Sequence, residues 1–83
     1  MAISPAQCRA GRALIDMSQV ELGRLAEVSS RTILDFEANK REPIKATLAA
    51  IQRALETAGV EFTNGEQPGV RLAKKKTGGR RNS

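Results

Sequence analysis

Histidine, tryptophan and tyrosine are absent from this chain, and cysteine occurs only at position 8. A disulfide needs two cysteines, and a structural zinc site needs four ligands that are usually cysteine and histidine. The composition therefore predicts no internal disulfide, no metal site and no bound cofactor. Because paired carboxylates in a cleft and a phosphate-binding loop are also missing, we do not expect an enzyme. We expect Cys8 to be a small buried apolar group, with a redox switch as the alternative.

Aromatic residues are scarce as well, since Phe36 and Phe62 are the only two. The core must then be built from aliphatic side chains, which is typical of a small helical bundle of one domain. The sequence has no apolar run near the ~20 residues of a membrane span and no signal-peptide pattern. We therefore expect a cytoplasmic protein with no membrane contact.

The positive charge lies at the C-terminal end. The chain carries 14 lysine and arginine residues against 9 acidic residues, a net charge of +5. Residues 74–83, KKKTGGRRNS, hold five of the basic residues and no acid, so residues 1–73 are balanced. This composition predicts a disordered basic tail. The tail is expected to be a solvated, non-specific tether to nucleic acid, and minor-groove reading by Arg80 and Arg81 is the alternative.

Two amphipathic patterns lie close together in residues 19–38, QVELGRLAEVSSRTILDFEA. Apolar residues recur at helical spacing in each pattern, which predicts helices over 19–26 and 30–37 that share one small core. The residues expected on the inner faces are Leu22, Leu25 and Ala26 in the first helix, and Ile33, Phe36 and the Thr32 methyl group in the second.

The short connection between these helices also fits this arrangement. Val28 is placed to fill the corner where the helices meet, and Ser29 is placed to cap the second helix. The spacing is that of a helix-turn-helix, which leaves the outer face of the second helix free to touch DNA. That outer face carries Ser30, Arg31, Leu34 and Asp35.

Further helices are predicted on either side of this pair. Ser4, Pro5 and Gln7 form a capping box with proline at the first helical position, so we expect a helix over 5–16. A last helix is expected over 46–58, ended by Gly59. The positions predicted to be buried are Cys8, Gly11 (at a close helix crossing), Leu14, Ile15, Leu48, Ile51 and Leu55, and those predicted to face solvent or phosphate are Arg9, Arg12 and Asp16.

Two short alternating patterns, residues 60–62 and 70–72, flank a loop with Asn-Gly and Pro-Gly pairs and predict a hairpin. Two three-residue strands are not stable alone in water, so the hairpin must pack on the helices or pair with a second copy. We expect a dimer contact within residues 59–73, because the hairpin needs a partner for its apolar face. The residues of that contact would be Val60, Phe62, Val70 and Leu72.

The complete pattern reads SQxxLxxxAxVSxxTIxxFE, then proline, then TLxxIxxAL. It resembles the lambda-repressor-like (xenobiotic-response-element type) helix-turn-helix family. The resemblance covers residues 4–58 and implies a compact helical domain whose third helix enters the DNA major groove, in bacterial or phage transcription control. The predicted fold class is therefore all-α: a four-helix helix-turn-helix domain (1–58), a short C-terminal β-hairpin or strand pair (59–73) and the disordered basic tail (74–83).

The resemblance also implies roles for individual residues. Gln19 is implied to touch phosphate and to brace the third helix. Arg31 can donate two hydrogen bonds to guanine, worth about 1–3 kcal/mol of discrimination. Asp35 either accepts a hydrogen bond from cytosine or holds Arg31 one turn away. The implied base contacts are Ser30, Arg31, Leu34 and Asp35, and the implied phosphate contacts are Gln19, Ser29, Thr32, Asn39, Lys40 and Arg41.

Two residues depart from the family pattern. Glu27 stands where the family usually has glycine, at a position expected to need positive φ at a cost on the order of 1 kcal/mol. Gly23 stands where the family usually has alanine, which permits a closer approach but weakens the helix. For a third residue, Glu37, we expect a pairing with Lys40 or Arg41.

These observations predict a sequence-specific transcriptional regulator, most simply a repressor, that binds double-stranded DNA at a palindromic operator as a homodimer. When bound to DNA it would be associated with the nucleoid. The alternatives are an adaptor or anti-activator that binds another regulatory protein, and an antitoxin, each keeping the same fold. About 25 residues follow the last predicted helix, so we expect no small-molecule effector.

Overall fold

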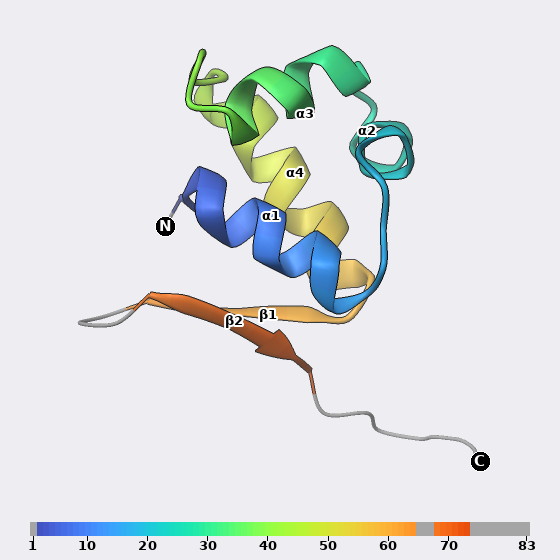
Figure 1. Cartoon of the computed structure of the whole chain (residues 1–83), viewed down its shortest axis with the longest axis vertical. Helices are drawn as coiled ribbons and strands as arrows, with labels where there is room; N and C mark the ends of the chain where they lie inside the picture. Colours follow the sequence, from blue (N-terminus) through green and yellow to red (C-terminus); the bar gives the residue numbers. More distant parts are fainter. Residues whose placement is uncertain (1, 65–67, 74–83) are drawn as a thin grey trace.

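A computed structural model describes residues 2–64 and 68–73 of the chain, which form four helices and a two-stranded antiparallel sheet. Figure 1 shows α3 at one end and the sheet at the other, with α1 and α4 between them. The predicted basic tail, residues 74–83, lies outside the described residues. The elements are α1 (Pro5–Leu14), α2 (Gln19–Ala26), α3 (Ser30–Glu37), α4 (Lys45–Thr57), β1 (Val60–Thr63) and β2 (Gly69–Leu72).

The predicted small helical domain with a C-terminal hairpin is confirmed, and α2 and α3 have the predicted bounds. The capping box at Ser4 is present, because the Gln7 N–H donates to Ser4 Oγ and the Ser4 N–H donates to Gln7 Oε1. Helix α1 ends two residues earlier than predicted, since Asp16 has a positive φ of 58°. No helix within the described ranges is long and apolar enough to cross a membrane.

Helices α1, α2 and α3 end in the same backbone arrangement. A residue with positive φ follows each helix, and the next N–H donates to the carbonyl five positions earlier at 2.8–2.9 Å. Glycine is usual at the positive-φ position, because a β-carbon costs roughly 1–2 kcal/mol there. The positive φ predicted for Glu27 is confirmed, and the three residues concerned are Asp16 (58°), Glu27 (61°) and Asn39 (62°).

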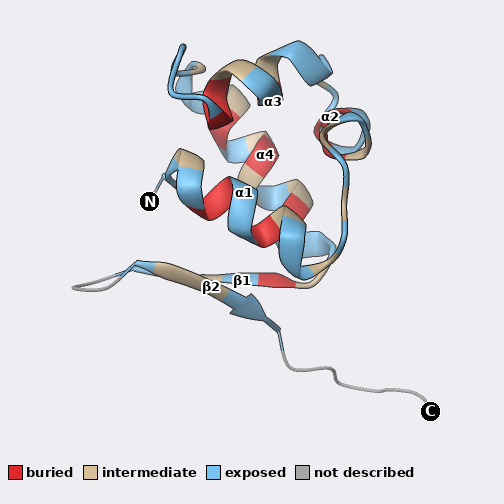
Figure 2. Ribbon diagram, viewed as in Figure 1, coloured by how far each residue is buried: buried red, intermediate tan, exposed pale blue. Residues whose placement is uncertain are grey.

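The core is aliphatic apart from Phe36 and Cys8 and lies where the four helices and β1 meet (Figure 2). Two predictions of burial are wrong. Leu14, the last residue of α1, is exposed, and the half-buried Ile15 packs on the core instead. Leu25 is 43% exposed because it lies at the mouth of a groove between α2 and α4. The buried apolar residues are Ile3, Cys8, Leu22, Ala26, Ile33, Phe36, Leu48, Ile51, Leu55 and Val60.

The hairpin packs on α1 through a glycine. A β-carbon at Gly11 would lie 3.3 Å from Val60 Cγ1 and 3.6 Å from the Phe62 ring, so the element that approaches Gly11 is a strand and not the helix expected. Gln7 holds the end of the hairpin at which Thr63 pairs with Gly69, since its Nε2 donates to the carbonyls of Thr63 at 3.2 Å and Gly69 at 3.1 Å. The hairpin therefore takes the first of its two predicted alternatives and packs on the helices.

Candidate nucleic-acid interface

The last residue of α3, Glu37, is a buried carboxylate with partners on two other helices. It is 4% exposed. Arg12 of α1 donates from Nε to Oε2 at 2.8 Å and from Nη2 to Oε1 at 2.7 Å, which forms a two-point pair. Gln19 at the start of α2 donates to Oε1 at 3.0 Å, and Cys8 Sγ donates to Oε2 at 3.0 Å. One carboxylate thus joins α1, α2 and α3.

The surrounding backbone takes part in the same network. Arg12 also donates from Nη1 to the Met17 carbonyl at 2.8 Å, and Arg9 donates to the Glu37 carbonyl. Two predictions are corrected here. Arg12 does not face solvent, and Glu37 does not pair with Lys40 or Arg41, because the last turn of α3 places its carboxylate on the inner face with Ile33 and Phe36.

These contacts shift three pKa values in the same network. Burial alone raises the pKa of Glu37, but hydrogen bonds from Arg12, Cys8 and Gln19 outweigh it and hold the pKa below its usual value. The hydrogen bond with Glu37 raises the pKa of Arg12. Burial, followed by the hydrogen bond to Glu37, raises the pKa of the Cys8 thiol. The thiol is therefore a protonated donor at neutral pH, which agrees with the expected small buried group.

The connection from α2 to α3 passes very close to Gly23. A β-carbon there would lie 2.8 Å from the Val28 carbonyl oxygen and 3.3 Å from the Ser30 amide nitrogen. Gly23 is therefore needed by the turn in this chain. Ser29 then caps α3 as predicted, since the Thr32 N–H donates to Ser29 Oγ at 3.1 Å.

The outer face of α3 carries the four residues predicted to contact bases. Ser30, Arg31 and Leu34 are exposed, and Asp35 is half-buried. Arg31 Nε donates to both carboxylate oxygens of Asp35, at 3.2 and 3.3 Å. The Arg31 side chain is 75% exposed and that of Asp35 is 18% exposed. Of the two roles considered for Asp35, the structure favours holding Arg31.

The residues predicted to contact phosphate lie at both ends of α3. Gln19 contacts the C-terminal end of α3 through its hydrogen bond to Glu37, which is the contact expected of a brace; its phosphate contact stays a prediction. The hydroxyls of Ser29 and Thr32 share a 3.0 Å hydrogen bond at the N-terminal end. Asn39, Lys40 and Arg41, which follow α3, are all exposed. Across residues 2–64 and 68–73, neither Lys40 nor Arg41 has an ion pair within 4.0 Å.

The residues predicted to form the dimer contact are not brought near α3. Figure 1 shows the hairpin on the far side of α1. Val60 is buried in the core, Phe62 and Val70 are half-buried against it, and only Leu72, 57% exposed, is open. The apolar face that was expected to need a second copy is thus largely covered by the chain's own helices.

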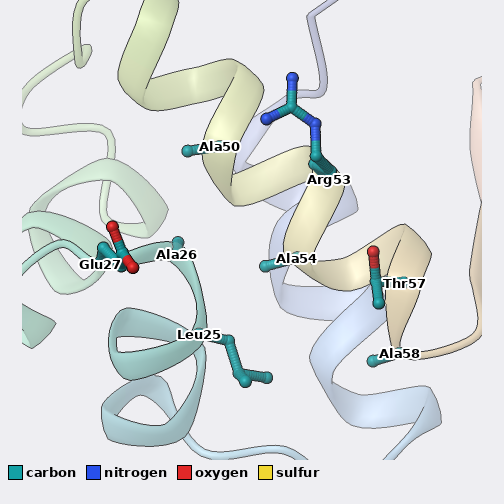
Figure 3. Close-up of a pocket in the computed structure, with 8 residues that line it drawn as sticks. All are labelled: Leu25, Ala26, Glu27, Ala50, Arg53, Ala54, Thr57 and Ala58. Carbon is teal, nitrogen blue, oxygen red and sulfur yellow. The ribbon is translucent and has the colours of Figure 1, made fainter.

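A groove of about 480 Å³ opens between α2 and α4 (Figure 3). None of its lining residues belongs to α3, so it is separate from the face that carries Arg31. No pattern in the sequence predicted it, because Leu25 has the spacing of a core residue. The groove is lined by Leu25, Ala26, Glu27, Ala50, Arg53, Ala54, Thr57 and Ala58.

Arg12 and Cys8 were not predicted as partners of Glu37. They lie 25 and 29 positions away from it, and no local pattern links them. Comparison with protein-family models finds none that matches this chain, and comparison with curated proteins finds no match either.

Proposed function

We propose that this protein is a sequence-specific DNA-binding transcriptional regulator, most simply a repressor, and that α2 and α3 act as a helix-turn-helix with α3 in the major groove. The observation that carries the proposal is the asymmetry of α3. Its inner face is joined to α1 and α2 through Glu37, and its outer face presents to solvent an arginine that is paired with Asp35. A rigid helix with a free polar face has the form that groove reading requires.

Arg31 is the residue most directly suited to reading a base. Arg31 is bonded to Asp35 through Nε, and its two terminal nitrogens form no hydrogen bond with another described residue, so they remain available to a ligand. A guanine presents two acceptors, O6 and N7, at the spacing of those nitrogens. We expect each half-site to contain a guanine opposite Arg31, with Ser30 and Leu34 contacting the neighbouring base edges.

Phosphate contacts would flank this reading face. Lys40 and Arg41 follow α3 directly and are exposed. Each phosphate that they neutralise releases counterions and adds close to −0.9 to the slope of log affinity against log salt. The remaining phosphate contacts in the proposal are the start of α2 at Gln19, the hydroxyls of Ser29 and Thr32, and Asn39.

One recognition helix buries too little surface for tight binding, so the proposal includes a homodimer on a palindromic operator. Two-fold symmetry would place the two α3 helices in half-sites about one helical turn apart. A cytoplasmic, nucleoid-associated protein that needs no cofactor or metal fits this function.

The experiment that tests the proposal is selection of bound duplexes from a random DNA pool, followed by gel-shift titration at several salt concentrations. We expect a palindromic site with a guanine in each half, and a loss of about 10–100-fold in affinity for Arg31→Ala. Arg71→Ala removes one charge at the far end of the molecule and should change affinity less than about twofold. If Arg31→Ala binds the selected site as tightly as the parent protein, α3 is not the reading helix.

A protein-binding adaptor is the second candidate, and the charge balance of residues 1–73 favours it. A DNA-binding domain usually carries excess positive charge on its folded part. The two candidates separate on a single observation, since an adaptor would select no DNA site and show no salt-dependent DNA binding.

A further inference from the structure

The groove between α2 and α4 has the form of a small apolar recess with one large side chain at its edge. Its floor is built from short side chains, chiefly Ala50 and Ala54 of α4 and Ala58, which directly follows α4. Leu25 projects toward it from α2 and is 43% exposed, whereas Leu22 in the same helix is fully buried. One surface thus carries a protruding side chain, Leu25, and a recess floored by alanines that could receive the same leucine of another molecule.

The two walls of the groove carry opposite charges. Glu27 lies on the α2 side and Arg53 on the α4 side (Figure 3). Neither forms an ion pair with another described residue, although four other ion pairs are present in that part of the chain. Glu27 is also held in a left-handed conformation that glycine would adopt at lower cost.

We propose that this groove is the surface through which a second copy of the chain docks. In a two-fold contact, the α2 wall of one subunit faces the α4 wall of the other. Glu27 then meets the partner's Arg53, and Arg53 meets the partner's Glu27, so both unpaired charges are neutralised at once. The two Leu25 side chains cover the alanine floors between them, which gives an apolar centre with a charged rim.

This contact is compatible with the rest of the fold. No α3 residue lines the groove, so Arg31 remains free for DNA. The hairpin cannot offer the same apolar area, because Val60 is buried and Phe62 and Val70 are half-buried. The inference rests on the proposed function only for its consequence on operator binding; self-association itself is measured without DNA.

The test is sedimentation equilibrium of the full chain without DNA, from about 10 µM to 1 mM. We expect a monomer–dimer equilibrium. Glu27→Arg and Arg53→Glu should each raise the dissociation constant by about tenfold or more, because each places two like-charged pairs in the dimer. The double variant Glu27→Arg/Arg53→Glu should recover association, and a mixture of the two single variants should form heterodimers.

Leu72→Ser is the matched control, since Leu72 is the exposed apolar residue of the hairpin. It should leave the dissociation constant unchanged, whereas Leu25→Ser should raise it. Circular dichroism of every variant separates a change in association from a loss of fold. The proposal is overturned by a monomer at all concentrations, by charge reversals without mutual rescue, or by a dimer sensitive to Leu72→Ser alone.

A failure of this proposal is distinguishable from a failure of the proposed function. A dimer that depends on the groove but selects no DNA site would support the interface and contradict the regulator. The opposite result is a protein that binds a palindromic site but whose self-association is unaffected by substitution of Glu27 and Arg53. It would support the regulator and contradict the interface.

Discussion

Two carboxylates of α3, only two residues apart, have opposite environments. The Glu37–Arg12 ion pair is enclosed, because 3% of the Glu37 side chain and 19% of the Arg12 side chain are exposed. The Asp35 pair lies on the outer face, where 75% of the Arg31 side chain is in solvent. An enclosed pair cannot be broken without leaving a charge out of water, whereas an open pair adds little to stability. The same chemistry therefore fixes the helix on one face and orients an arginine on the other.

The largest effect is expected when Glu37 is replaced by alanine. This leaves the half-buried Arg12 without its partner and removes the acceptor for Gln19 and Cys8, so we expect a loss of about 3–5 kcal/mol in the free energy of unfolding. Urea denaturation at neutral pH measures the change. Asp35→Ala, on the other face of the helix, should cost less than about 1 kcal/mol. Equal losses for the two variants would show that the comparison of the two faces is wrong.

Acid should weaken the fold through Glu37. Its pKa is below the unfolded value, so its ionised form contributes stability that is fully present above about pH 4.3 and is lost as pH falls through the folded pKa. Urea titrations between pH 7 and pH 3 should show a smaller acid loss for Glu37→Gln than for the parent chain. The control is Glu61→Gln, because the pKa of Glu61 is also lowered, by Arg71, but in an exposed pair. We expect that substitution to leave the acid profile nearly unchanged.

The local elements were predictable because their signals are local. The bounds of α2 and α3 follow from apolar spacing and from the Ser29 cap, and the positive φ of Glu27 follows from its place in the turn. The outer face of α3 followed from the same spacing. The Arg31–Asp35 pair, one turn apart in a single helix, was foreseen as one of two options for Asp35.

The long-range contacts were not predictable from one sequence. Arg12 has the pattern of a surface residue, and only the packing of α1 against α3 turns it toward Glu37. Leu25 has the spacing of a core residue, yet α4 presents alanines opposite it and leaves a groove. The hairpin was recognised, but the helix that covers it was not, since Gly11 gives no sign of which element approaches it.

Removing Asp35 should affect DNA binding more than stability, which would sharpen the contrast between the enclosed Glu37 pair and the open Asp35 pair. Without the carboxylate, Arg31 samples more rotamers and therefore loses more side-chain entropy when it binds guanine. We expect Asp35→Ala to lower affinity for the selected operator by about 3–10-fold and to relax the preference for guanine at that position, measured by gel shift on operators with each base substituted. Asp35→Asn, which keeps an acceptor for Arg31 Nε, should lose less. If Asp35→Ala instead relaxes a preference for cytosine, the carboxylate reads a base directly.

Substitution of a third carboxylate, Glu27, is expected to have the smallest effect on stability. Glu27 is exposed and forms no ion pair with another described residue. At φ 61° and ψ 41° its β-carbon is strained. We expect Glu27→Gly to stabilise the isolated subunit by about 0.5–1 kcal/mol, since the relief of strain exceeds the added freedom of the unfolded chain. Glu27→Ala keeps the β-carbon and should leave thermal stability unchanged.

The pair of variants also separates strain from charge in the dimer. If Glu27 meets the partner's Arg53, glycine and alanine should weaken self-association equally, although only glycine stabilises the subunit. Sedimentation at matched concentrations and thermal unfolding of dilute protein measure the two effects. A stabilised subunit that associates less well would mean that the carboxylate serves the interface at the expense of the turn. If both variants associate normally, Glu27 is only a strained turn residue, and the proposed ion pair between Glu27 and the Arg53 of a second copy does not form.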